Sequence, residues 1–240
     1  NKKDSDVLII DASKGFEKDG KNNKLRACDI KRIVDAYKER PEKIKKFARR
    51  VSRAEIIQND YNLNIPRYVD SSEKAESWDI YASMFGGIPE AELQDLSAYW
   101  TAFPHLKAAL FSPDNEAYCH LNVQNLKNAV LNHPDVVAFK TAFQNAFGDF
   151  DAYLKSALID GITQLNAAGE EERLSREIFA RLAGIPLVDR YAAYQLLDDD
   201  WKKIAIDLEI IQTEGFAATK QVDPNMVLKK DAEVQDGWVG

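Results

Sequence analysis

The densest group of side chains that could do chemistry is a basic run, KERPEKIKKFARRVSR, at residues 38–53. Only Glu39 and Glu42 oppose its eight cations. Lysine and arginine at this density suit contacts with phosphates, which supply affinity for nucleic acid whatever its sequence. A solvated helix face would give the same pattern, and both interpretations stay open. The candidate residues for binding nucleic acid are Lys38, Lys43, Lys45, Lys46, Arg49, Arg50 and Arg53.

Other residue types that carry chemistry lack the companions that they would need. No glycine-rich turn with GxGxxG spacing follows a predicted strand. His105, His120 and His133 have no cysteine or carboxylate partner at ligand spacing, so they are expected on the surface or at helix caps. Asp198–Asp200 are consecutive and would point in different directions on a helix, which favours a solvated face over a cation site. We therefore predict no catalytic, cofactor-binding or metal-binding residue.

Charge is divided unevenly along the 240 residues, whose net charge is −7. Residues 1–74 hold 19 basic and 13 acidic side chains, whereas residues 75–240 hold 13 basic and 26 acidic ones. This asymmetry predicts two modules with different partners, and the acidic module is not expected to wrap DNA by itself. Two distant cysteines without a CxxC motif fit a reducing compartment.

The sequence of residues 1–74, which we call the basic module, predicts an α/β piece. The β-branched run DVLIID, residues 6–11, predicts a buried strand of an α/β sheet, and the polar residues 13–24 predict a loop. A helix is expected over residues 30–40, with Asp29 as its cap. A Ser-x-x-Glu capping box predicts a short helix over residues 52–59. The apolar stripe of the first helix, expected to face the core, is Ile30, Ile33, Val34 and Tyr37.

The stretch NDYNLNIPRYVD, residues 59–70, alternates apolar and polar side chains before a proline. Alternation predicts a half-buried strand at the edge of the sheet. Leu63 and Ile65 would then bury one face in that sheet. The amides of Asn62 and Asn64 would satisfy backbone groups where the chain leaves it.

From residue 91 onward the apolar period is helical, and proline or glycine marks most boundaries. The longest expected helix covers residues 190–215, with Gly215 just beyond its last turn. Residues 222–240 lose the helical period and predict a short hairpin. The predicted fold class is mainly α with an N-terminal α/β piece, divided into domains at 1–74 and 75–240.

Three segments of the basic module carry a resemblance: IIDASKGFEKDGKNNKL, IKRIVDAYKER and VSRAEIIQNDYNLNIPRYVD. They resemble the end of the methyltransferase domain in the modification subunit of type I restriction–modification systems. The similarity extends through LSAYWTAFPHLKAALF to DLEIIQTEGFAATKQVDPNMVLKK and QDGWVG, so it covers nearly the whole chain. It implies the last elements of a Rossmann-like domain followed by an all-α C-terminal domain.

The resemblance also implies an activity and a set of partners. Such subunits methylate adenine N6 in DNA with S-adenosylmethionine, together with a specificity subunit and, in the full complex, a restriction subunit. The implied location is the prokaryotic cytoplasm. In the family, the glycine-rich cofactor loop and the Asn-Pro-Pro-aromatic loop lie upstream of the Ile-Asp-Ala-Ser strand, and this chain begins after both. The expectation is therefore a C-terminal fragment, inactive alone, with no bound cofactor.

Two hypotheses of different class follow. In the first, residues 38–53 help to hold duplex phosphates for an adenine-N6 DNA methyltransferase. In the second, the acidic helical part is an assembly module that docks on the specificity subunit and makes no DNA contact. A salt-sensitive DNA affinity that depends on the basic run would favour the first.

Overall fold

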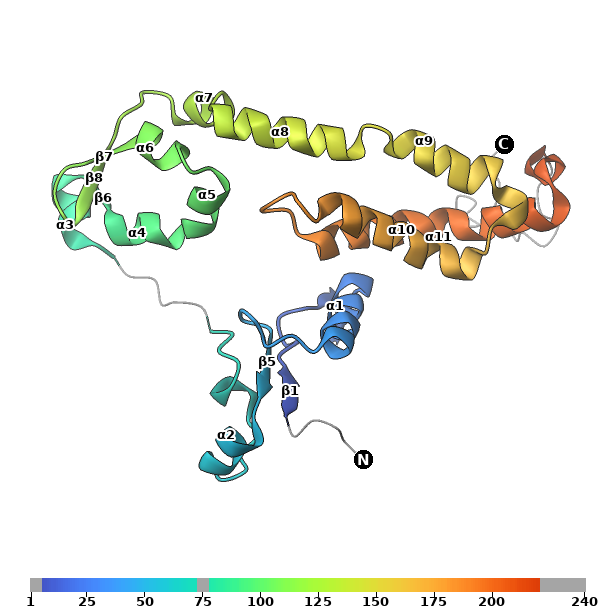
Figure 1. Cartoon of the computed structure of the whole chain (residues 1–240), viewed down its shortest axis with the longest axis horizontal. Helices are drawn as coiled ribbons and strands as arrows, with labels where there is room; N and C mark the ends of the chain where they lie inside the picture. Colours follow the sequence, from blue (N-terminus) through green and yellow to red (C-terminus); the bar gives the residue numbers. More distant parts are fainter. Residues whose placement is uncertain (1–5, 73–77, 221–240) are drawn as a thin grey trace. The chain divides into compact units, whose positions relative to one another are not determined.

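A computed structural model describes residues 6–72 and 78–220 of the chain, which are mostly helical with small sheets (Figure 1). The chain divides into two compact units. Unit 1 comprises Asn1–Ser77 with Tyr191–Gln195, and unit 2 comprises Trp78–Arg190 with Leu196–Gly240. The hairpin predicted at 222–240 lies outside the described residues. No helix in the described ranges is both long and apolar enough to span a bilayer.

The sheet of unit 1 has the strand order β1-β5-β4, with both pairs antiparallel. Strand β1 (Val7–Ile10) confirms the strand predicted at residues 6–11. It runs beside β5 (Ala48–Val51), which in turn pairs with the two-residue strand β4 (Lys43–Ile44). A Rossmann-like sheet is parallel for the most part, so that arrangement stays a prediction.

Both faces of strand β5 carry a small core, in which Ala48 and Val51 at its two ends are buried. Ala48 is 1% exposed and clusters with Ala36 of α1 (Ala27–Glu39) and with Phe47. Val51, which is fully buried, points to the opposite face and clusters with Ile56 of α2 (Arg53–Gln58). Because the side chains of this short strand alternate between the two faces, one helix packs on each face of the sheet.

Helix α1 begins differently from the prediction. Its N-cap is Arg26, and Asp29 is the third helical residue, where its carboxylate accepts from the Arg26 backbone N–H at 3.1 Å. The same carboxylate receives the Arg26 guanidinium at 2.8 and 3.0 Å. This reciprocal capping satisfies a backbone donor that the helix leaves unpaired. The predicted cap residue is thus correct in kind but wrong in position.

The apolar stripe predicted for the core is mostly exposed on α1. Ile30, Val34 and Tyr37 are 49%, 38% and 68% exposed, and only Ile33 packs against the core. The residues that α1 buries are Cys28 and Ala36. A small alanine lets the helix approach the sheet closely, so the helix turns this face inward. The prediction was wrong because periodicity does not measure this close approach.

Two short elements complete the local structure of this unit. Residues 13–24 were predicted as a loop, but they contain the hairpin β2 (Glu17–Asp19) and β3 (Asn22–Lys24). Gly20 makes its turn with φ of 60°. Helix α2 confirms the predicted capping signal, because Ser52 Oγ accepts from the Glu55 backbone N–H at 3.2 Å.

The strand predicted in residues 59–70 is wrong. Asp60 and Tyr61 have left-handed φ angles of 53° and 57°, which no strand accommodates. The chain then forms η1 (Ile65–Arg67), a 3₁₀ turn, and leaves Leu63 and Ile65 56% and 38% exposed.

In residues 59–70, the hydrogen bonds of a turn take the place of the predicted strand pairing. The Asn62 side-chain oxygen accepts from the Asn64 backbone N–H at 2.9 Å, as the short polar side chains of turns commonly do. Tyr68, which is buried, donates its hydroxyl to the Asn62 carbonyl at 2.5 Å. The expectation that an asparagine amide satisfies the backbone is therefore confirmed for Asn62, in a turn that seats Tyr68.

Unit 2 is mainly helical, but the all-α prediction for it was wrong. Strands β6 (Ile88–Pro89), β8 (Tyr118–Leu121) and β7 (Phe111–Pro113) form an antiparallel sheet in that order. The first half of the unit also holds α3 (Ile80–Phe85), α4 (Glu90–Asp95), α5 (Ser97–Ala102), α6 (Leu106–Leu110) and α7 (Leu126–Leu131). The second half holds α8 (Pro134–Phe147), α9 (Phe150–Leu154), η2 (Lys155–Asp160), η3 (Ile162–Gln164), α10 (Ala167–Leu182), α11 (Arg190–Glu214) and η4 (Phe216–Lys220).

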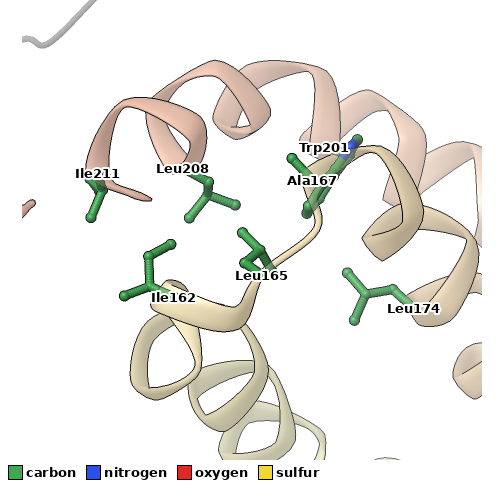
Figure 2. Packing of buried hydrophobic residues seen from close by; sticks show 7 residues of the cluster. All are labelled: Ile162, Leu165, Ala167, Leu174, Trp201, Leu208 and Ile211. Carbon is green, nitrogen blue, oxygen red and sulfur yellow. The ribbon is translucent and has the colours of Figure 1, made fainter. Parts of the chain in front are cut away.

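The second half of unit 2 has a core of its own, in which α10 and α11 contribute most of the side chains (Figure 2). Helix α11 confirms the predicted long helix, and Gly215 follows it with φ of 77°. The buried members of the cluster are Ile162, Leu165, Ala167, Leu174, Trp201, Leu208 and Ile211.

Replacing Asp29 with Ala is expected to loosen α1, because the Arg26 backbone N–H and guanidinium lose their acceptor. Loss of an N-terminal cap costs about 1 kcal/mol. Amides of residues 27–39 should then exchange with solvent about fivefold faster. Hydrogen exchange read by mass spectrometry measures this, with the exposed Asp19→Ala as a control that leaves α1 unchanged.

The same contact predicts a pH dependence. The hydrogen bonds from Arg26 hold the pKa of Asp29 below its usual 3.8 in the folded chain. A lowered folded pKa means stabilisation that is complete above the unfolded value and is lost as pH falls through the folded one. The difference between wild type and Asp29→Ala should be constant above about pH 5 and should vanish in stronger acid. A difference that persists in acid would contradict this role.

Replacing Leu174 with Ala is expected to destabilise unit 2, because the side chain is 1% exposed inside the core shown in Figure 2. Leucine-to-alanine changes in such cores cost about 2–5 kcal/mol. Urea unfolding followed by circular dichroism measures the loss. Leu196→Ala is the matched control, because Leu196 is 70% exposed and should change stability little. Equal losses in the two variants would contradict the assigned core.

Candidate nucleic-acid interface

The basic run does not form one helix face, so that interpretation of its pattern was wrong. It spans the end of α1, strand β4, a turn, strand β5 and the start of α2. Successive strand residues point to opposite faces of the sheet, which separates the directions of Arg49 and Arg50. In the antiparallel register, Lys43 lies opposite Arg49. The cations therefore surround the β4–β5 hairpin instead of lying along one line.

Two of the seven candidates are already engaged within unit 1. Arg49 donates to both oxygens of the Glu55 carboxylate, at 2.8 and 2.9 Å. Arg50 lies 3.9 Å from the Asp6 carboxylate. A bidentate pair satisfies the donor fork of an arginine, so Arg49 has little left to offer an external phosphate. The structure therefore assigns Arg49 to holding β5 against α2.

The other five candidates are exposed, and in the described ranges none of them forms a salt bridge. Lys46 has a left-handed φ of 58° in the turn that reverses the chain between the antiparallel strands β4 and β5. These cations are available to a partner from solvent. They are Lys38, Lys43, Lys45, Lys46 and Arg53.

Carboxylates near the turn are held charged by hydroxyl groups. Hydrogen bonds from Ser13 and Ser71 lower the pKa of Asp11, and Ser71 Oγ lies 2.5 Å from its Oδ2. The Ser72 hydroxyl and backbone likewise lower the pKa of Asp70. Both carboxylates thus stay ionised at neutral pH, and the hydrogen bonds that they accept come from serines.

The remaining candidates from the sequence behave mostly as structural groups. His133 accepts from the Asp135 backbone N–H at 3.2 Å, which confirms a cap role, and His105 is 82% exposed. Asp198 was expected on a solvated face, but it is buried and receives Lys202 at 2.5 Å. Among the residues that the structure describes, no group of three histidines, cysteines or carboxylates could hold a metal.

An exposed apolar surface on α3 and on Trp78, two residues before the helix, was not predicted from the sequence. Exposed apolar side chains occur around most of this helix, so its sequence has no one-sided apolar stripe from which the surface could be predicted. Tyr81 stacks near Phe85 and Tyr118 with ring centroids 4.9 and 5.0 Å apart, and Asp79 caps the helix. The exposed fractions are 84% for Trp78, 72% for Ile80, 53% for Tyr81, 71% for Met84 and 70% for Phe85. We call these five residues the α3 surface.

Comparison with known proteins places similarity in the N-terminal part of the chain. The family model for N-6 DNA methylase matches residues 1–77. The MpnII methylase subunit of a type I restriction enzyme from Mycoplasma pneumoniae is 36% identical over 80 residues, covering 33% of this chain and 14% of that protein. The MjaVII methylase subunit from Methanocaldococcus jannaschii is 43% identical over 77 residues, covering 31% of this chain and 13% of that protein.

A solved structure is also similar. It is the type I restriction-modification system methyltransferase subunit from Streptococcus thermophilus, which is 50% identical over 30% of this chain and 15% of that one, with a TM-score of 0.29. The chain thus spans about one seventh of the relatives that it matches. Residues 1–77, which form most of unit 1 and hold the basic run, match the N-6 DNA methylase family model, and type I restriction enzyme methylase subunits are similar to this chain.

Proposed function

We propose that the chain is the C-terminal part of a type I restriction–modification DNA methyltransferase subunit, which methylates adenine N6 with S-adenosylmethionine. In this role unit 1 supplies phosphate contacts and the last elements of a Rossmann-like catalytic domain. The specificity and restriction subunits are the proposed protein partners. No described residue is assigned to the chemical step or to the cofactor.

One observation carries this proposal. The residues that match the N-6 DNA methylase family model also hold, around the β4–β5 hairpin, five exposed cations that form no salt bridge with any residue that the structure describes. Phosphate contacts of this kind position a duplex and carry no sequence information. Such contacts suit a subunit that works beside another subunit, which recognises the DNA sequence.

A second function is supported by unit 2. The α3 surface exposes contiguous aromatic and aliphatic side chains, and exposed patches of that kind mark protein interfaces. We propose that it docks the specificity subunit, so that residues 75–240 act as an assembly module. Their excess of acidic side chains disfavours a direct DNA role. The two functions are compatible, because different units perform them.

The DNA role predicts a change in salt dependence. Replacing Lys38, Lys43 and Arg53 together with Gln should weaken binding of a fluorescent duplex and flatten its salt dependence. Each lost phosphate contact lowers the slope of log affinity against log salt by about one. Fluorescence anisotropy between about 50 and 200 mM salt gives that slope.

The matched control removes three exposed lysines of unit 2, as Lys127→Gln with Lys155→Gln and Lys220→Gln. It makes the same charge change without touching the basic run. Equal weakening by both triple variants would mean that net charge alone attracts the duplex, and it would refute the interface on unit 1.

The assembly role predicts that binding of the specificity subunit depends on the α3 surface. Trp78→Ala with Phe85→Ala should weaken capture of the specificity subunit at least about tenfold, because buried aromatic anchors dominate protein interfaces. Biolayer interferometry measures it, and Leu196→Ala controls for loss of an exposed apolar residue. Unchanged affinity in the double variant would remove the α3 surface from the interface.

A further inference from the structure

A hollow of about 440 Å³ opens beside the β4–β5 turn, within unit 1. Three parts of the chain supply most of its wall: the loop after β1, the first turns of α1 and the turn itself. Its size suits a small ligand. Five of its side chains are cationic, and two are carboxylates. The cations are Lys14, Arg26, Arg32, Lys45 and Lys46.

Contacts inside the hollow leave a positive excess. Arg26 is neutralised by Asp29, its bidentate partner. The second carboxylate, Asp11, takes its hydrogen bonds from Ser13 and Ser71. The other four cations form no salt bridge with any residue in the described ranges. Two carboxylates against five cations leave a net charge of +3 on the residues that line the hollow.

The walls are built to keep these cations in place. The Arg32 guanidinium lies 4.2 Å from the centre of the Phe47 ring, and Phe47 is 8% exposed. A cation held on a buried aromatic face loses much of its rotational freedom before any ligand arrives. The Asp11 backbone N–H donates to the Phe47 carbonyl at 2.7 Å, which ties the loop after β1 to the β4–β5 turn. Lys14 and Lys45 therefore lie on two backbone segments that are joined beside the hollow.

Glycine is favoured at one point of the wall. A Cβ on Gly15 would lie 2.7 Å from Asp29 Oδ1, closer than a Cβ atom approaches a neighbour, so Asp29 would have to shift away from Arg26. The missing side chain thus lets the loop fold against the capped start of α1. This close approach brings the loop lysine and the α1 arginine to the same hollow.

We propose that this hollow binds a phosphate group of a DNA strand. Lysine ammonium groups and an arginine fork are the donors that recognise phosphate oxygens, and the excess charge matches an anion. Assignment of the phosphate to DNA rests on the function proposed above, whereas the phosphate site itself does not. The site adds Lys14 and Arg32 to the cations of the basic run, and it fixes one phosphate at a defined place.

The test follows backbone amide resonances of the whole chain by nuclear magnetic resonance. The probes are inorganic phosphate, the dinucleotide TpT with its single internal phosphodiester, thymidine 5′-monophosphate and a short duplex. Thymidine without phosphate is the negative control. Phosphate-bearing probes should shift the amides of Gly15 and Phe47, and thymidine should not.

Two variants with equal charge change separate the hollow from the rest of the basic run. Lys14→Gln with Lys45→Gln should weaken TpT and phosphate binding by about tenfold or more, since a charged hydrogen bond contributes about 1.5–3 kcal/mol. Lys38→Gln with Lys43→Gln, outside the hollow, should weaken binding of the duplex, as expected above, but not binding of TpT or inorganic phosphate, which are small enough to occupy the hollow alone. These four lysines are exposed, so the variants should fold, and their thermal unfolding verifies it.

Each outcome has a definite meaning. Absence of phosphate-dependent shifts at Gly15 and Phe47, or equal weakening of TpT and phosphate binding by both double variants, overturns the site. If only the outer variant weakens duplex binding, the hollow is overturned while the DNA function stands. Binding of phosphate and thymidine 5′-monophosphate without TpT or duplex keeps the phosphate site, assigns it to a free nucleotide and overturns its DNA role.

Discussion

The antiparallel pairing of β1 with β5 is the constraint on which unit 1 depends. Its register places Ile10 opposite Ala48, and the Asp11 N–H extends the ladder to the Phe47 carbonyl. The loop that leaves β1 must therefore lie beside the turn that enters β5. The pairing also buries β5 between two small cores, which fixes α1 and α2 on opposite faces. Cations far apart in the sequence converge because of this backbone ladder.

Only some cations of unit 1 have a carboxylate partner among the residues that the structure describes. Arg26 and Arg49 each have a bidentate carboxylate and serve the fold, capping α1 and joining β5 to α2. The cations around the β4–β5 turn have no such partner in the described part of the unit, and the nearby Asp11 is occupied by serines. Like charges held close together repel, and a bound anion would relieve that repulsion. The same arrangement favours a phosphate ligand.

Sequence patterns predicted the elements whose signals are local. The β-branched run gave β1, the Ser52 cap gave α2, and Gly215 marked the end of α11. The strand predicted for residues 59–70 was wrong. Apolar and polar side chains do alternate there, but Asp60 and Tyr61 have left-handed backbone conformations, so the segment forms a turn instead of a strand. The sheet of unit 2 was missed because β6 has two residues, too few to show a period.

The candidate site was predicted in composition but not in geometry. Seven cations could be read from one run, yet only the fold distinguishes Arg49, which is engaged by Glu55, from the exposed Lys43 opposite it. Lys14 and Arg32 lie outside the run, so no spacing rule connected them with Lys45. Their convergence comes from the strand register and from Gly15, a tertiary effect that a linear pattern does not record.

Hydrogen exchange of the whole chain with and without duplex DNA tests most directly whether unit 1 is the surface that meets nucleic acid. We expect slower exchange on DNA binding in residues 11–15 and 45–47, where the cations converge, and no change in residues 78–190 and 196–220 of unit 2. Protection confined to those residues of unit 2, with residues 11–15 and 45–47 unaffected, would contradict the assignment of DNA contacts to unit 1.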